Sequence, residues 1–285
     1  MFITLLQQEF IRNAFLAGTV VALVTGIIGY FVVLRTEAFA SDSLSHIGFA
    51  GATGGPLFGL SSLVGMLILT LLSALGIGIL GERVRGRDVE TGMVLAFALG
   101  LGVLFTGLYA SGSNASATVN ALFGSILSVT PGAIAITSVV GALVLVALVI
   151  VFRPLLFASI DPEVAQARGV PTRLLSILFL LLLAITIAIA IQVVGALLVF
   201  ALLIAPAASA MRFTHRPLTS ITLSVIFGLA ITWTGLLLTV VGTGRYLPAS
   251  FYIATLATLL YVASALAHHW QINKRGYKEI SFRAQ

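Results

Sequence analysis

An aspartate and a histidine four residues apart lie within an otherwise apolar stretch of this chain. The stretch reads AFASDSLSHIGFAGATGGPLFGL, and the pair is Asp42 and His46. Four residues of α-helix advance about 400°, so the carboxylate and the imidazole would lie one above the other on a single helix face. Ionisable groups inside a membrane segment are costly to bury and usually face a cavity, a partner or a passing ion. The spacing therefore predicts a shared contact with a cation.

The ligand types narrow the class of cation. A carboxylate and a neutral imidazole suit first-row divalent metal ions. The chain has no cysteine, which excludes thiolate metal sites, disulfides and cysteine nucleophiles. Two ligands make an incomplete site, which water, backbone carbonyls, a second copy of the chain, or Ser41 and Ser45 would complete. The alternative for the pair is a hydrogen bond between Asp42 and His46 that only fixes helix packing.

Composition places this pair in a membrane protein. Of the 285 residues, 59% are hydrophobic and 8% are charged, against about a quarter charged in a soluble domain. We expect an all-α, polytopic integral membrane protein with about eight or nine transmembrane helices. A total of eight spans is the alternative to nine, because 38–58 is polar enough to be re-entrant and because only the region around Gln192 separates the sixth candidate from the seventh. The nine candidates are 13–34, 38–58, 61–80, 91–110, 131–152, 174–191, 193–212, 218–241 and 249–269.

Charge in the connecting segments predicts the orientation. Lysine and arginine in short loops concentrate on the cytoplasmic side. Nine spans with the N-terminus outside leave only Arg12 and Arg245 on the outer side. The segment 153–173 and a tail at 270–285 would then be cytoplasmic, and the net charge of +6 would reflect topology and no nucleic-acid partner. The predicted inner residues are Arg35, Arg83, Arg85, Arg87, Arg153, Arg168, Arg173, Arg212, Arg216, Lys274, Arg275, Lys278 and Arg283.

The connection 153–173 contains the sequence IDPEVAQARGVP, which is typical of a short helix. Asp161 can cap the helix, Pro162 fits its first position and Glu163 complements the positive end of its dipole. Gly169 can terminate it after about two turns. The helix either joins two spans as an ordinary surface element or docks a soluble subunit.

Two further segments each allow two interpretations. Pro206, in LLIAPAASA, would remove one backbone hydrogen bond, and the resulting kink would either line a pathway or serve packing. The segment 114–131 is too polar at its start for a simple span, and we expect a short outer or re-entrant helix there.

The sequence also bounds the energy source. It contains no G-x-x-x-x-G-K-[ST] phosphate loop, and its two lysines, Lys274 and Lys278, are near the C-terminus. ATP-driven transport would therefore require a separate nucleotide-binding subunit.

Four segments in order give the chain a specific resemblance. They are VVLRTEAFASDSLSHIGFAG at 32–51, LFGSIL at 122–127, IDPEVAQARGVP at 160–171 and VVGALLVFALLIAPAASAM at 193–211. Together they resemble the permease subunits of the ABC-3 family of bacterial metal-ion importers, which includes zinc, manganese and iron systems. The resemblance implies that 1–285 is a single transmembrane permease domain in the bacterial inner membrane, that it is not itself an enzyme, and that it works by alternating access.

The resemblance also implies roles for individual residues. The family's D-x-x-x-H pattern falls on Asp42 and His46, which would contact the transported divalent metal ion. Its D-P-E segment falls on Asp161, Pro162 and Glu163, which would couple the permease to its ATPase. The family further implies a homodimeric core in membrane lipid, a cytoplasmic ATP-binding subunit and an extracytoplasmic metal-binding protein.

The chain departs from the family pattern beside the metal pair. Ser41 stands where glycine commonly precedes the aspartate, and Phe49-Ala50-Gly51 stands where Leu-Pro-Gly commonly follows the histidine. These changes leave open which metal passes.

Two functions from other classes are the alternatives. An intramembrane hydrolase would use Ser43 or Ser45 as nucleophile and His46 as base, but neighbours on one helix converge poorly and no G-x-S-x-G elbow is present. An ion-coupled secondary transporter fits the composition and the buried carboxylate but not the four family segments.

Overall fold

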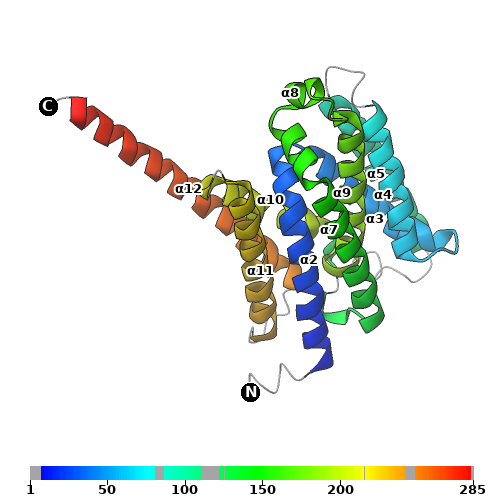
Figure 1. The fold of residues 1–285 in the computed structure, drawn as a ribbon. Helices are drawn as coiled ribbons and strands as arrows, with labels where there is room; N and C mark the ends of the chain where they lie inside the picture. The colour runs from blue at the N-terminus through cyan, green and yellow to red at the C-terminus, as the bar shows by residue number, and fades with distance from the viewer. Residues whose placement is uncertain are drawn as a thin grey trace.

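The computed structural model describes residues 8–80, 87–110, 122–124, 126–214, 216–241 and 248–283, and every regular element in these ranges is helical. Figure 1 shows the long helices gathered in a bundle, with the last of them, α12, extending away from it. They are α2 (Glu9–Leu34), α3 (Ala38–Leu57), α4 (Ser62–Leu80), α5 (Arg87–Ala110), α7 (Pro131–Ile160), α9 (Thr172–Val194), α10 (Ala196–Phe213), α11 (Pro217–Val241) and α12 (Ala249–Arg283), with the short η1 (Ile126–Ser128) and α8 (Pro162–Ala167) between them.

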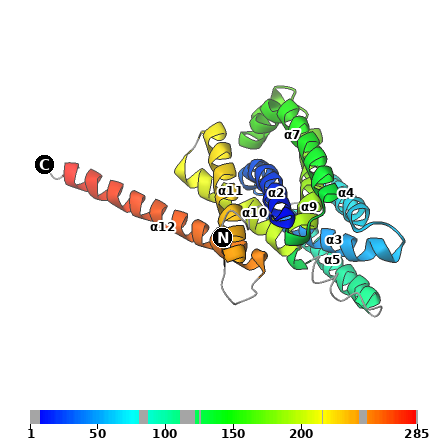
Figure 2. The same ribbon diagram turned by 90° about the horizontal axis from the view of Figure 1, so that it is seen from below.

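Helices α2 and α9 form the centre of the bundle. About two thirds of the apolar segment of each is buried, whereas the shares for α5, α7 and α12 are 17%, 22% and 22%. Figure 2 shows α2 with α7, α9, α10 and α11 around it, and α3, α4 and α5 grouped on one side. The outer helices therefore present apolar side chains to the surroundings, as lipid-facing helices do.

Eight helices among the described residues are long and apolar enough to cross a membrane. They correspond to eight of the nine candidate spans. The ninth candidate forms α3, which has 20 residues and a length of about 30 Å but is too polar to meet the same criterion. It is one continuous helix, and most of its residues are buried against its neighbours. Asp42 and His46 therefore lie on an interior helix.

A tight turn joins α2 to α3. The Arg35 backbone N–H donates to the Phe31 carbonyl, and the Glu37 N–H donates to the Val32 carbonyl, at 2.9 Å each. Thr36 between them has a positive φ of 56°, which few non-glycine residues adopt. The turn is short enough that Arg35 and Glu37 belong to the same local structure.

Helices α9 and α10 are separated at Gly195, three residues beyond the expected boundary at Gln192. Gly195 has a φ of +85° and lies against Gly124, whose φ is +75°. A Cβ atom on either glycine would overlap the backbone of the other segment. The break therefore holds the chain around Gly124 in place. Half of 114–131, including its polar start, lies outside the described residues, and the described half contains η1.

Two helices continue past their expected ends. Helix α7 was expected to end at residue 152 but runs to Ile160 with Pro154 in its interior, because Leu155 and Ala158 are buried in the core and hold the extra turns in place. The connection that carries α8 is therefore shorter than 153–173. The backbone of α12 is helical to Arg283 and extends away from the bundle (Figure 1), where we expected the helix to end near residue 269.

Candidate metal contact and coupling helix

Asp42 and His46 lie on one face of α3, as their spacing predicts. The His46 Nε2 atom is 3.7 Å from the Asp42 Oδ1 atom, which is beyond hydrogen-bond distance. Zinc binds imidazole nitrogen and carboxylate oxygen at about 2.0–2.2 Å, so two such ligands at a tetrahedral angle lie about 3.4 Å apart. The pair is thus near the separation that one shared ion requires, and the direct packing hydrogen bond is not formed.

The pair also points away from the tightest packing of its helix. Gly51 and Gly55 of α3 contact Gly65 of α4 so closely that a Cβ atom on Gly51 would overlap the α4 backbone. Each member of the pair precedes one of these glycines by nine residues, a rotation of about half a turn. The side chains of His46 and Asp42 keep 25% and 32% of their surface exposed. The pair is therefore accessible on a helix that is otherwise mostly buried.

The serines around the pair are engaged with backbone. The Ser41 hydroxyl donates to the Ala38 carbonyl at 2.7 Å, and the Ser45 hydroxyl donates to the Ser41 carbonyl at 2.9 Å. Both side chains are buried and would offer a metal ion only a remaining lone pair. Ser43 is fully buried and donates to the carbonyls of Phe39 and Thr91. That geometry disfavours Ser43 as a hydrolytic nucleophile.

The ligand set of one chain is incomplete among the described residues. Within them, no group of three or more histidine, aspartate or glutamate side chains gathers in metal-binding geometry. An ion at Asp42 and His46 would need further ligands from water, backbone or a second copy of the chain. Ligation by this pair stays a prediction of the spacing and the chemistry.

The DPE segment forms the short helix α8, capped as predicted. The Asp161 Oδ1 atom accepts a hydrogen bond of 3.0 Å from the Val164 N–H, Pro162 occupies the first helical position and Glu163 lies in the first turn. Gly169 follows the helix with a φ of +80°. Glu163 and Val164 are exposed, so α8 presents a surface at one end of the bundle (Figure 1). Its coupling role stays a prediction.

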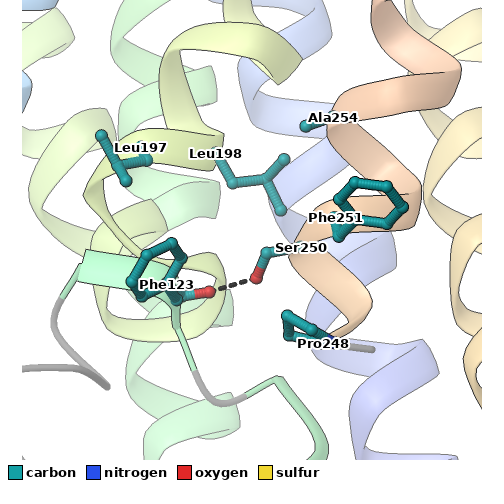
Figure 3. A pocket seen from close by; sticks show the side chains of 7 residues that line it. All are labelled: Phe123, Leu197, Leu198, Pro248, Ser250, Phe251 and Ala254. Carbon is teal, nitrogen blue, oxygen red and sulfur yellow. Dashed lines mark hydrogen bonds between the residues drawn. The ribbon is translucent and has the colours of Figure 1, made fainter. Parts of the chain in front are cut away.

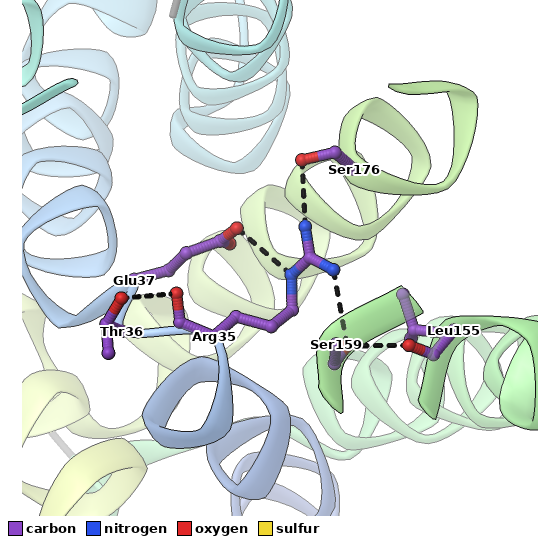
Figure 4. Close-up of polar contacts among 6 residues, drawn as sticks. All are labelled: Arg35, Thr36, Glu37, Leu155, Ser159 and Ser176. Atoms are coloured by element: carbon purple, nitrogen blue, oxygen red, sulfur yellow. Dashed lines mark hydrogen bonds and ion pairs between the residues drawn. The ribbon is translucent and has the colours of Figure 1, made fainter. Parts of the chain in front are cut away.

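A polar cluster that we did not predict lies beside α8. Arg35 donates to Glu37 Oε1 at 3.1 Å, to Ser159 Oγ at 3.3 Å and to Ser176 Oγ at 2.8 Å (Figure 4). The guanidinium also lies 5.3 Å from the centroid of the Phe179 ring. The sequence feature that could have predicted this cluster is an arginine and a glutamate two residues apart at the end of an apolar stretch. We had interpreted Arg35 only as a cytoplasmic charge.

Pro206 is buried within α10, next to a close contact between α10 and α2. A Cβ atom on Gly29 of α2 would overlap the Leu203 carbonyl, one turn before Pro206. This contact favours a packing role for the region. A pathway-lining role for Pro206 stays a prediction.

The end of the bundle opposite α8 contains an apolar pocket of about 310 Å³. Figure 3 shows Leu197 and Leu198 of α10 facing Phe251 of α12, with the Ser250 hydroxyl donating to the Phe123 carbonyl. The pocket has no ionisable side chain in its lining, so it cannot hold a metal ion by charge.

These features together define a polytopic, all-helical membrane protein. Residues 7–268 match the ABC 3 transport family, and the chain belongs to that family. It is 32% identical to the manganese transport system membrane protein MntC of Halalkalibacterium halodurans, over 92% of this chain and 86% of that protein. It is 31% identical to the high-affinity zinc uptake system membrane protein ZnuB of Haemophilus influenzae, over 81% of this chain and 88% of that protein.

A solved structure shares the fold. The structure of PsaBC from Streptococcus pneumoniae in complex with Fab superposes on this chain with a TM-score of 0.82, at 29% identity, over 93% of this chain and 95% of the other. The chain is thus a membrane permease of an ABC importer and not itself an ATPase, as the resemblance implied. This membership decides against the hydrolase and the ion-coupled transporter.

Proposed function

We propose that this chain carries manganese or zinc ions inward, and that each ion contacts Asp42 and His46 on the way. The observation that carries the proposal is the partial exposure of both side chains on α3, a helix that is mostly buried. Leaving a carboxylate and an imidazole accessible inside a membrane protein is costly unless a cation or a partner meets them. Their separation of 3.7 Å suits a shared ion after a small adjustment.

The chemistry and the relatives support the same two metals. Carboxylate oxygen suits Mn²⁺, imidazole nitrogen suits Zn²⁺, and both metals accept a mixed pair. Two relatives with 32% and 31% identity are named for manganese and zinc transport, respectively. Iron, which the sequence also allowed, becomes a competing cargo to be tested in the same assay.

A second copy of the chain is the expected partner at the metal pair. The side of α3 that carries Asp42 is half a turn from α4, and its partly exposed surface is available to another subunit. Two copies facing each other across a symmetry axis would bring two carboxylates and two imidazoles to one ion. This arrangement would complete the ligand set while leaving each contact weak enough for release.

Charge in the connecting segments and the position of α8 support one orientation of the chain in the membrane. If α3 also crosses the membrane, the chain has nine spans. The N-terminus then lies outside, and the α8 end of the bundle lies in the cytoplasm. Arg35 and Arg173 lie at that end. A cytoplasmic ATP-binding subunit would dock on α8, through Asp161, Pro162 and Glu163, and an extracytoplasmic metal-binding protein would deliver the ion at the opposite end.

Uptake of Mn²⁺, Zn²⁺ and Fe²⁺ by cells that express the complete complex tests the proposal. We expect Asp42→Asn and His46→Ala each to lower uptake of one or both of the first two metals at least about tenfold, the usual consequence of losing one ligand or its support. Glu9→Gln, which removes an exposed carboxylate, and His215→Ala, which removes a histidine outside the D-x-x-x-H pattern, are the matched controls. Wild-type uptake by both pair variants, with the complex assembled, would contradict the proposal.

A further inference from the structure

One guanidinium joins three segments that are distant in the sequence. Arg35, in the turn between α2 and α3, bonds Ser159 in the last turn of α7 and Ser176 in the second turn of α9. It also forms an ion pair with Glu37, whose side chain is 2% exposed, while that of Arg35 is 10% exposed (Figure 4). Arginine is the residue suited to such a contact, because its planar fork reaches several acceptors at once.

The two serines flank the helix that is expected to meet the ATPase. Ser159 lies two residues before Asp161, the N-cap of α8, and Ser176 lies on the helix that follows α8. Arg35 and Glu37 line a polar hollow of about 380 Å³ together with Pro162 of α8. Both ends of the connection that carries α8 are therefore held by the same side chain.

On its other side the cluster leads directly into α3. The Glu37 carbonyl accepts from the Ser41 N–H at 3.0 Å, within the first turn of α3. Asp42 follows Glu37 by five residues, an axial distance of about 7.5 Å. Because α3 is one continuous helix, a displacement of its first turn moves Asp42 and His46 with it.

We propose that Arg35 and Glu37 are positioning residues that transmit movement of α8 to the metal pair on α3. This inference rests on the proposed function, since it assigns a route between the ATPase contact and the metal contact. A largely buried, charge-assisted contact holds its partners in one arrangement, because separating them leaves a charge unpaired. Movement of α7 and α9 around α8 therefore acts on the α2–α3 turn through this contact.

The test is the number of ATP molecules hydrolysed for each Mn²⁺ or Zn²⁺ ion imported by the complete complex in proteoliposomes. We expect Arg35→Ala to raise this ratio at least about tenfold, in line with the loss of hydrogen bonds to a charged group, with KM for the metal within about twofold of wild type. Arg35→Lys keeps the charge without the fork, and Glu37→Gln keeps the shape without the charge, so each should raise the ratio by a smaller factor.

Arg212→Ala is the matched control. Arg212 also joins two helices, with bonds to the Tyr261 carbonyl at 3.1 Å and to Ser264 Oγ at 3.2 Å, but it connects α10 to α12. We expect this variant to change uptake and hydrolysis together and to leave their ratio unchanged.

The inference would be overturned if Arg35→Ala, Arg35→Lys and Glu37→Gln all kept the number of ATP molecules hydrolysed per imported ion within about twofold of wild type. Failure of all three to assemble would also overturn it, because the contact would then be purely structural. If only Arg35→Ala fails to assemble, Arg35→Lys and Glu37→Gln decide the question. The proposed function fails on a different result, namely unchanged uptake by the Asp42 and His46 variants.

Discussion

Gly51 and Asp42 lie on opposite sides of α3, nine residues apart. The glycine side lies against the backbone of α4, where a Cβ atom on Gly51 would fall 2.7 Å from the Met66 Cα atom. The acidic side keeps a third of the Asp42 side chain exposed. The close contact with α4 therefore fixes the rotation of α3 and, with it, the direction of the metal pair.

We predict that Gly51→Val disturbs transport without touching either ligand. The added side chain must push α3 and α4 apart, and overpacking of this kind costs about 1–3 kcal/mol. Thermal unfolding of the purified complex should occur at a lower temperature, and metal uptake should fall. Gly76→Ala on α4 is the control, because nothing lies within 4 Å of its Cβ position. Equal unfolding temperatures for the two variants would contradict the prediction.

The break between α9 and α10 leads to a second prediction. Gly195→Ala combines a positive φ with an overlap between the new Cβ atom and the chain at Gly124, whereas Gly169→Ala meets only a positive φ of 80°. We expect the second change to cost about 1–2 kcal/mol and the first to cost clearly more. Yield and unfolding temperature of the two variants provide the comparison, and a milder effect at Gly195 would be inconsistent with the close contact.

Helix α8 permits capping to be separated from charge. Asp161→Ala removes the acceptor for the Val164 N–H and should cost the short helix about 1 kcal/mol, whereas Asp161→Ser keeps an acceptor. If α8 docks the ATPase, the alanine variant should bind that subunit more weakly in co-purification, and the serine variant should bind it nearly as wild type does. Equally weakened binding of the ATPase by both variants would show that docking depends on the charge of Asp161 and not on its capping hydrogen bond.

The absence of cysteine makes accessibility measurable at single positions. We predict that His46→Cys reacts with a water-soluble thiol reagent in the assembled complex, and that Zn²⁺ slows the reaction. Ser43→Cys, three residues earlier and fully buried in the wild-type chain, should react far more slowly. Comparable reaction rates at the two positions would remove the evidence that the pair faces an open path.

Helix positions followed from local features of the sequence. The expected span 38–58 matches α3 at Ala38–Leu57, and the expected span 218–241 matches α11 at Pro217–Val241. In both cases the length of the segment and the turn residues beside it indicate where the helix begins and ends. The cap at Asp161 and the stacking of Asp42 on His46 were predictable for the same reason, since each involves residues within one helical turn.

Contacts between distant segments could not be predicted in this way. Ser159 and Ser176 lie 124 and 141 residues after Arg35, so only the packed bundle shows that one guanidinium reaches both. The end of α7 was missed because Arg153 and Pro154 resemble a helix stop, whereas the burial of Leu155 and Ala158 carries the helix past them. Tertiary packing outweighed the local signal.

The most direct test of the metal pair is a double-mutant comparison of Mn²⁺ and Zn²⁺ uptake into proteoliposomes that contain the complete complex. If Asp42 and His46 hold the same ion, removing either ligand removes most of the contact, and the variant carrying both Asp42→Asn and His46→Ala should transport no more slowly than the worse single variant. Losses that multiply in the double variant would show two independent roles. Uptake at the wild-type rate in all three variants would contradict the account.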